Sequence, residues 1–242
     1  MRDKRVQQFE VMKEHMLSLN LKIEKAKMFD LKNFKNVNLH DKIQKIEFFQ
    51  ENVISTLFKF RDPLVLVYGS AHKAGGGVLT GAKAQEEDLS RATTWYFHVK
   101  DNDEYYKKEH SNLLYSSDCL YIKNAFLLTN EFIIPTVPKH ISMIGAAAPN
   151  LSGMIKSGNL IEEKLIYSEF QERLEGMFNL AEQFNHETFI IGAWGCGVFG
   201  LNPNKIASIY KKVISKKLYS GKIVFSIMDQ EHYSIFKSIL EN

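Results

Sequence analysis

Two periodicities alternate in the hydrophobic positions of this chain. Short apolar runs that end at Gly or Pro are typical of buried strands, and apolar positions spaced by three and four residues are typical of amphipathic helices. The clearest strand is the apolar run 63–68, which begins at Pro63 and ends before Gly69. Similar runs predict strands at 120–122, 132–134, 141–144, 188–192 and 222–228, with a short strand near Val37.

Helical spacing fills most of the segments between these runs. The predicted helices cover residues 4–27, 43–60, 85–95, 161–184, 202–218 and 230–240. Strands and helices that alternate in this way indicate an α/β fold, a mixed β-sheet with helices on both faces. We expect one domain over residues 1–242, with a mainly helical N-terminal extension at 1–60 and a ligand-binding core at 61–242. The first helix is expected to pack on this domain, and its use as a handle for a partner is the weaker alternative.

Length, charge and cysteine content are those of an ordinary globular protein. The 242 residues carry a formal net charge of +3, which neither requires nor excludes a nucleic-acid partner. No apolar run approaches the roughly 20 residues that a membrane span needs, and the N-terminus is polar. Cys119 and Cys196 lie far apart without metal-ligand spacing. We therefore expect a monomer without membrane segments in the reducing cytoplasm.

The candidate chemistry lies just after the first strand. Three consecutive glycines, Gly75 to Gly77, let the backbone approach a bulky anion and offer amide donors to a phosphate. Seven residues later, Gln85, Glu86 and Glu87 begin a helix with two acids, a pair that suits acid–base chemistry on a sugar. Alone, a glycine triplet is more often a flexible loop and a Glu pair more often a solvated helix face. The order of strand, glycine loop and helix start favours an anion site.

These residues resemble a known family. The glycine triplet and the Gln-Glu-Glu motif are similar to the signature of poly(ADP-ribose) glycohydrolases of the microbial type, and segments 142–150, 192–200 and 222–229 resemble further parts of that family in the same order. The resemblance extends from about residue 46 to the C-terminus and implies a macrodomain-like fold that binds ADP-ribose. The chain departs from the family at Val67, where Asn is usual, at Ala74, where Pro is usual, and at Leu201, which precedes Asn202.

The resemblance implies the roles of the acidic residues. Glu87 would be the general acid that protonates the departing ribose 2′-oxygen, and would then activate the water that captures the oxocarbenium-like ribose. Such an acid needs a raised pKa, which a desolvated pocket, the neighbouring Glu86 and a diphosphate would each favour. Glu86 would hold ribose hydroxyls, and Gln85 would orient the loop or contact the ribose.

The same resemblance implies the binding residues. Both glycine loops would approach the diphosphate through Gly75, Gly76, Gly77, Gly195, Cys196, Gly197 and Val198. Phe199 would pack on a ribose, although a core aromatic is an open alternative. Asn150 either contacts the pocket or only ends its strand, and Cys196 lacks an identifiable base, so we interpret it as a small pocket-lining residue. His72 and Lys73 could balance phosphate charge or be solvated loop residues. We expect no cofactor and no metal.

Three functions fit these residues. The first is an enzyme that hydrolyses the ribose–ribose O-glycosidic bonds of poly(ADP-ribose) and releases ADP-ribose. The second is a reader that binds ADP-ribose on modified proteins without turnover, and the third is a hydrolase of single ADP-ribose units on protein or nucleic acid. The complete Gln85-Glu86-Glu87 motif favours an enzyme, because a reader does not need a protonating acid.

Overall fold

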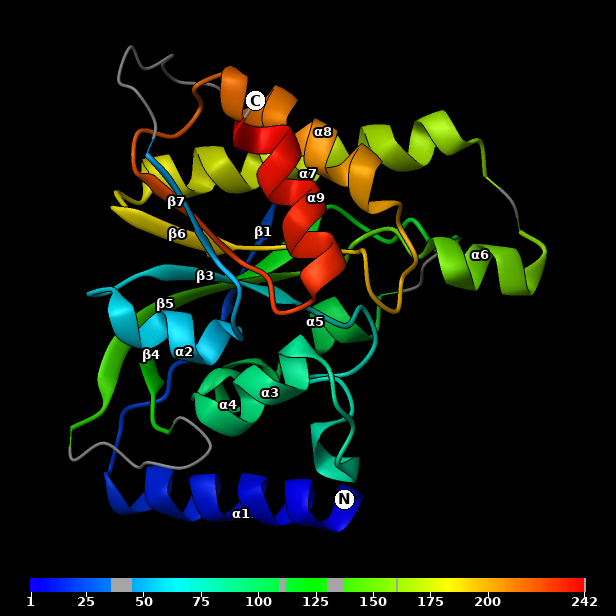
Figure 1. Cartoon of the computed structure of the whole chain (residues 1–242). Helices are drawn as coiled ribbons and strands as arrows, with labels where there is room; N and C mark the ends of the chain where they lie inside the picture. Colours follow the sequence, from blue (N-terminus) through cyan, green and yellow to red (C-terminus); the bar gives the residue numbers. More distant parts are fainter. Residues whose placement is uncertain (36–44, 109–111, 130–136, 160, 242) are drawn as a thin grey trace.

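The computed structural model describes residues 1–35, 45–108, 112–129, 137–159 and 161–241 (Figure 1). In this part of the chain a seven-stranded sheet has the order β1-β4-β5-β3-β6-β7-β2. The strands are β1 (Lys27–Asp30), β2 (Ile46–Phe49), β3 (Leu64–Tyr68), β4 (Asp118–Leu127), β5 (Lys139–Ala146), β6 (Thr188–Ile191) and β7 (Lys222–Ser226).

The sheet is mixed. β4 pairs antiparallel with both β1 and β5, whereas β5, β3, β6, β7 and β2 follow one another in parallel pairs. The carboxyl ends of five parallel strands therefore meet at one edge of the sheet, where ligands bind in many α/β proteins.

Helices cover both faces of the sheet, which confirms the predicted fold class. They are α1 (Arg2–Ser18), α2 (Val53–Lys59), α3 (Gln85–Ala92), α4 (Trp95–Val99), α5 (Asp103–Tyr106), α6 (Leu151–Ser157), α7 (Glu163–Gln183), α8 (Pro203–Ser215) and α9 (Gln230–Glu241), with short 3-10 turns η1 (Leu31–Asn33) and η2 (Val78–Thr80). In Figure 1, α7, α8 and α9 lie above the sheet, α2, α3 and α4 lie below it, and α1 forms an outer layer beneath α3 and α4. No helix in the described ranges is long and apolar enough to cross a membrane.

The central strand β3 is apolar throughout because it is buried on both faces of the sheet. Leu64 and Leu66 pack in the core under α7 and α8, and Val65 and Val67 pack in a second core with Leu89 of α3. Alternate side chains of a strand point to opposite faces, so a strand that is covered on both sides needs apolar residues at every position.

The predicted helix over residues 43–60 is wrong in its first half. Ile46–Phe49 forms β2, paired in parallel with β7, and α2 begins only at Val53. The side chain of Asn52 caps this helix by accepting the N–H of Ser55 at 2.9 Å. The apolar positions before Asn52 fit either period over so short a run, and pairing with β7 decides for the strand.

The predicted N-terminal helix is too long. It ends at Ser18, Asn20 has a left-handed φ of 49°, and Lys27–Asp30 forms β1 against β4. Residues 1–60 therefore supply both edge strands of the sheet in addition to α1 and α2.

The other predicted elements agree with the structure except in length. β4 extends well beyond the predicted 120–122, and α4, α5 and α6 are short helices without a clear sequence period. The strands expected near Val37 and at 132–134 lie outside the described residues.

Gly176 of α7 makes a close contact with η1 possible. This contact predicts that alanine at position 176 destabilises the protein. A Cβ at this position would lie 2.3 Å from the carbonyl oxygen of Leu31. In an open helix Gly→Ala is worth about 1 kcal/mol of added stability, but overpacking costs about 1–3 kcal/mol. We expect Gly176→Ala to lower the free energy of unfolding, measured by urea denaturation.

Ser168→Ala is the matched control for this measurement. Ser168 is an exposed position of the same helix, so its substitution reports helix propensity alone, with an expected change within about 0.5 kcal/mol. Stabilisation of the protein by Gly176→Ala would show that α7 and η1 are not in this contact.

Candidate active site

A cavity of about 550 Å³ lies at the edge where the parallel strands end. Its walls are formed by the start of α2, the end of β3, the start of α3 and the loops that follow β6 and β7. The segments after β2, β3, β6 and β7 meet here because each of them follows the carboxyl end of a parallel strand. α3 belongs to the segment after β3.

Gln85 fixes the start of α3 to the end of β3. Its Nε2 donates to the carbonyl of Leu66 at 2.7 Å, and its Oε1 accepts the N–H of Tyr68 at 2.9 Å. The side-chain amide of Gln85 therefore donates to and accepts from the backbone of β3, as the backbone of a neighbouring strand would. Of the two predicted roles for Gln85, this geometry matches orientation of the loop and helix.

Glu86 is a buried carboxylate with several donors. Its side chain lies in the cavity wall and the residue is only 3% exposed. One oxygen accepts the N–H of Ser70 at 2.7 Å and the other accepts the indole Nε1–H of Trp95 at 3.1 Å. Burial raises the pKa of Glu86 to about 8, against these two donors and the N–H of Gly75, which lower the pKa.

Glu87 points at the glycine triplet. Its Oε1 accepts the N–H of Gly77 at 2.8 Å, and a Cβ at Gly76 would lie 2.4 Å from the same oxygen. Gly75 and Gly76 have φ of 64° and 60°, a region that L side chains rarely adopt. Gly75 and Gly76 are therefore required by their backbone conformation, and Gly76 also by the close approach of the carboxylate.

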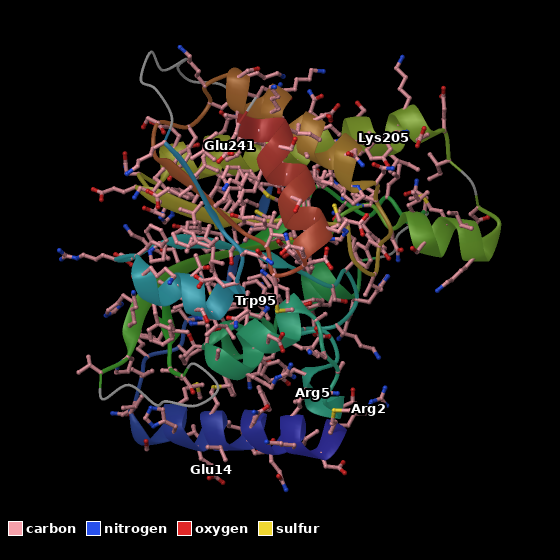
Figure 2. The ribbon with its side chains drawn as sticks, in the orientation of Figure 1. Arg2, Arg5, Glu14, Trp95, Lys205 and Glu241 are labelled. Atoms are coloured by element: carbon pink, nitrogen blue, oxygen red, sulfur yellow. The ribbon has the colours of Figure 1, made fainter. Side chains whose placement is uncertain are left out.

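The segment between the triplet and α3 is held from two sides. Arg5 of α1 donates from Nε to the carbonyl of Gly81 at 2.6 Å, and Figure 2 shows Arg2 and Arg5 beside this turn. From the other side, Arg91 of α3 donates to the carbonyl of Ala82 at 3.0 Å and pairs with Asp88. The N-terminal helix thus supports the loop that connects the glycines to the acids.

The second glycine loop follows β6 and forms the opposite wall. Gly195 has a φ of 81°, and Trp194 anchors the loop by donating its Nε1–H to the carbonyl of Ala146 on β5 at 3.2 Å. Val198 is 81% exposed at the mouth of the cavity, whereas Phe199 lines the cavity and is half-buried against the core.

Five predicted binding residues lie outside the lining: Gly75, Gly76, Gly77, Asn150 and Cys196. Cys196 is buried behind the second loop, and burial raises the pKa of its thiol to about 12. Asn150 caps α6 by accepting the N–H of Gly153 at 2.9 Å and donates to the hydroxyl of Tyr115. The cavity lining does include the other members of the second loop and the three residues of the acidic motif: Gly195, Gly197, Val198, Phe199, Gln85, Glu86 and Glu87.

Several lining residues were not predicted from the sequence. They are Glu51, Asn52, Tyr68, Ser70, Lys83, Asp88, Met228, Asp229 and His232. Ser70 and Asp229 lie within two residues of the ends of predicted strands, a signal that was available. Glu51 and Asn52 were hidden by the wrong helix over 43–60. Trp95 lies beneath the wall, and its contact with Glu86 has no local signal.

The raised pKa of Glu86 predicts a pH dependence of stability. An unfolded Glu releases its proton near pH 4.5 and the folded one near 8, so the folded state holds more protons between these values. Stability should fall by about 1.4 kcal/mol per pH unit as the pH rises through this window. We expect Glu86→Gln to remove this decline when melting temperatures are measured from about pH 5 to about pH 9.

Glu104→Gln, at an exposed carboxylate of α5, is the control and should retain the decline. Parallel curves for the wild type and Glu86→Gln would contradict the assignment of the raised pKa to Glu86.

Several solved structures of poly(ADP-ribose) glycohydrolases share this fold. Poly(ADP-ribose) glycohydrolase from Thermomonospora curvata, bound to the inhibitor ADP-HPD, matches with a TM-score of 0.83 at 20% identity, over 98% of this chain and 99% of that chain. Poly(ADP-ribose) glycohydrolase from Deinococcus radiodurans, in complex with ADP-ribose, matches with a TM-score of 0.80 at 23% identity, over 89% of this chain and 94% of that chain. At these identities the likeness establishes the fold. No curated protein matches the chain.

The family assignment comes from a sequence comparison. The family described as "Microbial-type PARG, catalytic domain" matches residues 4–129, just over half of the chain. This range contains most of α1, the glycine triplet, Glu86 and Glu87. The chain therefore belongs to the family of microbial-type PARG catalytic domains.

Proposed function

We propose that this protein hydrolyses the ribose–ribose O-glycosidic bonds of poly(ADP-ribose) and releases ADP-ribose in its cavity. The observation that carries the proposal is the placement of Glu87: its carboxylate lies in the cavity wall, 8% exposed, with one oxygen on the N–H of Gly77. A carboxyl group held at one oxygen has a second oxygen with which to protonate a leaving group. Family membership supports this function, and the macrodomain-like fold supports ADP-ribose as the ligand.

The charge of the cavity supports phosphate binding through backbone donors of the second glycine loop. Five carboxylates line the cavity, those of Glu51, Glu86, Glu87, Asp88 and Asp229, and Lys83 is the one lysine or arginine in the lining among the described residues. A diphosphate here depends on backbone donors.

The two glycine loops differ in the donors they offer. The N–H groups of Gly75, Gly76 and Gly77 are engaged with Glu86, Lys73 and Glu87, respectively. Those of Gly197, Val198 and Phe199 have no hydrogen bond within the described residues. The first loop thus positions the acids and the second binds the diphosphate.

The reaction follows from the acid pair. Glu87 donates its proton to the 2′-oxygen of the neighbouring unit as the bond from that oxygen to the anomeric carbon breaks, and the electron pair leaves with the oxygen. The oxocarbenium-like ribose that results is stabilised by the Glu86 carboxylate. Water then attacks the anomeric carbon and gives a proton to Glu87, which restores the acid.

We propose one catalytic domain over residues 1–242, because α1, β1 and β2 are joined to the sheet or to the loop beside the acids. We also propose that it acts as a cytoplasmic monomer on poly(ADP-ribose) attached to modified proteins. The two buried free cysteines are compatible with a reducing compartment.

Replacement of Glu87 tests the proposed acid. Glu87→Gln retains an oxygen that can accept the N–H of Gly77 but cannot give a proton to the 2′-oxygen. We expect the rate of ADP-ribose release from poly(ADP-ribose) to fall by about a thousandfold. The dissociation constant for ADP-ribose, measured by calorimetry, should change by less than about threefold, because the donors of the second loop remain.

The control for this variant is Glu163→Gln, a surface carboxylate paired with Lys205 at the start of α7, which should keep wild-type turnover. A wild type that binds ADP-ribose but releases none from the polymer would refute polymer hydrolysis. A parallel assay on singly ADP-ribosylated protein would then distinguish a hydrolase of single units from a reader.

A further inference from the structure

We infer that Trp95 is a positioning residue that locks the Glu86 side chain in place, so that Glu87 alone of the two neighbouring acids is free to transfer a proton. The inference rests on the proposed function for its catalytic meaning, and on the geometry of α3 and α4 for the contact itself.

The two acids are held very differently. Glu86 is engaged at both oxygens, by the indole of Trp95 at 3.1 Å and by the N–H of Ser70 at 2.7 Å, and also receives the N–H of Gly75. Glu87 has the single donor of Gly77 at 2.8 Å. The indole of Trp95 is a side-chain donor, whereas the N–H groups of Ser70 and Gly75 belong to the backbone. A substitution of Trp95 can therefore remove its donor without changing the backbone.

Such a lock is needed because the two carboxylates share one small space. A Cβ built on Gly76 would lie 2.4 Å from an oxygen of Glu87 and 3.4 Å from an oxygen of Glu86. Because both carboxylates border Gly76, a Glu86 side chain that was free to rotate could turn toward the substrate in place of Glu87. A fixed Glu86 removes this ambiguity.

Trp95 is itself firmly held. The residue is 1% exposed between α3 and the sheet, and its position in the interior can be followed in Figure 2. Its backbone N–H donates to the hydroxyl of Thr93 at 3.1 Å. Gly145 of β5 provides the space for its ring, since a Cβ there would lie 2.3 Å from Cη2. The indole N–H therefore reaches Glu86 from a rigid base on the sheet.

The charge state of Glu86 gives the contact a measurable consequence. The pKa of Glu86 is raised to about 8, chiefly by burial and in smaller part by the Glu87 carboxylate, while the N–H donors of Trp95, Ser70 and Gly75 oppose the rise. Tyr105 and Tyr106 are the other titratable groups that interact with Glu86. An indole donor favours the ionised form, so its removal should move the Glu86 pKa upward.

The first test reads the contact directly and needs no turnover. The chain has two tryptophans, so a ¹⁵N-labelled protein gives two indole N–H signals. We expect the Trp95 signal to titrate with a midpoint near pH 8 and to lose this titration in Glu86→Gln. The Trp194 signal is an internal control, because its indole donates to the backbone carbonyl of Ala146. A Trp95 signal that is flat from about pH 6 to about pH 10, or unaffected by Glu86→Gln, would overturn the inference.

The second test connects the contact to the reaction. Trp95→Phe keeps an aromatic ring in the slot and removes the donor. Loss of a donor that favours the ionised form of Glu86 should move the ascending limb of the pH profile of kcat upward by about one pH unit or more. Because ADP-ribose still binds the second glycine loop, we expect KM for poly(ADP-ribose) to change less than threefold while kcat at pH 7 falls about tenfold.

Tyr219→Phe is the matched control, because it also removes one donor from a buried aromatic residue, here a 2.8 Å bond to the carbonyl of His186, far from the cavity lining. It should leave the pH profile unchanged. A Trp95→Phe profile that overlies the wild type would overturn the positioning role. Absence of turnover in the wild type would refute the proposed function, while the indole titration would still decide whether Trp95 holds Glu86.

Discussion

The structure around the cavity is organised by the burial of two adjacent carboxylates in the first turn of α3. A buried carboxylate without hydrogen-bond donors is very unfavourable, and these two have 3% and 8% of their surface exposed. Their donors come from both sides of the helix start: backbone N–H groups of Ser70 and Gly77 in the loop after β3, and the indole of Trp95 on the next helix. The glycine triplet is therefore as much a support for the acids as a surface for a ligand.

This requirement explains why elements far from the cavity matter to it. Gln85 ties α3 to β3, Arg5 of α1 holds the turn at Gly81, and Gly145 of β5 leaves room for the ring of Trp95. Each contact limits the freedom of the segment between residues 69 and 95. The N-terminal helix thus belongs to the support of the site, although it contributes no residue to the lining of the main cavity.

The sequence predicted the fold class, most of the elements and the acidic motif, because long apolar periods and glycine spacing are local signals. It failed at residues 43–60, where a four-residue strand and a seven-residue helix have apolar spacings that resemble one long helix. That error concealed Glu51 and Asn52 as part of the cavity. It also gave no sign that Asn150 and Cys196, like the glycine triplet, lie outside the cavity lining, since a side chain that caps a helix and one that points behind a loop look the same in sequence as side chains that face a ligand. Trp95 was out of reach because its role depends on a contact between two helices and a strand.

The negative charge of the cavity affects the protonation of its acidic residues when an anionic substrate binds. A diphosphate that enters beside these carboxylates disfavours further negative charge, and so adds to the effect of burial on Glu86. Burial raises the pKa of Glu86 to about 8, and the N–H donors of Trp95, Ser70 and Gly75 oppose that rise. These donors therefore favour the ionised form of Glu86, whose carboxylate stabilises the developing positive charge on the ribose. Glu87 accepts the N–H of Gly77 at one oxygen and can turn the other toward the leaving group, so the two neighbouring residues can perform different tasks.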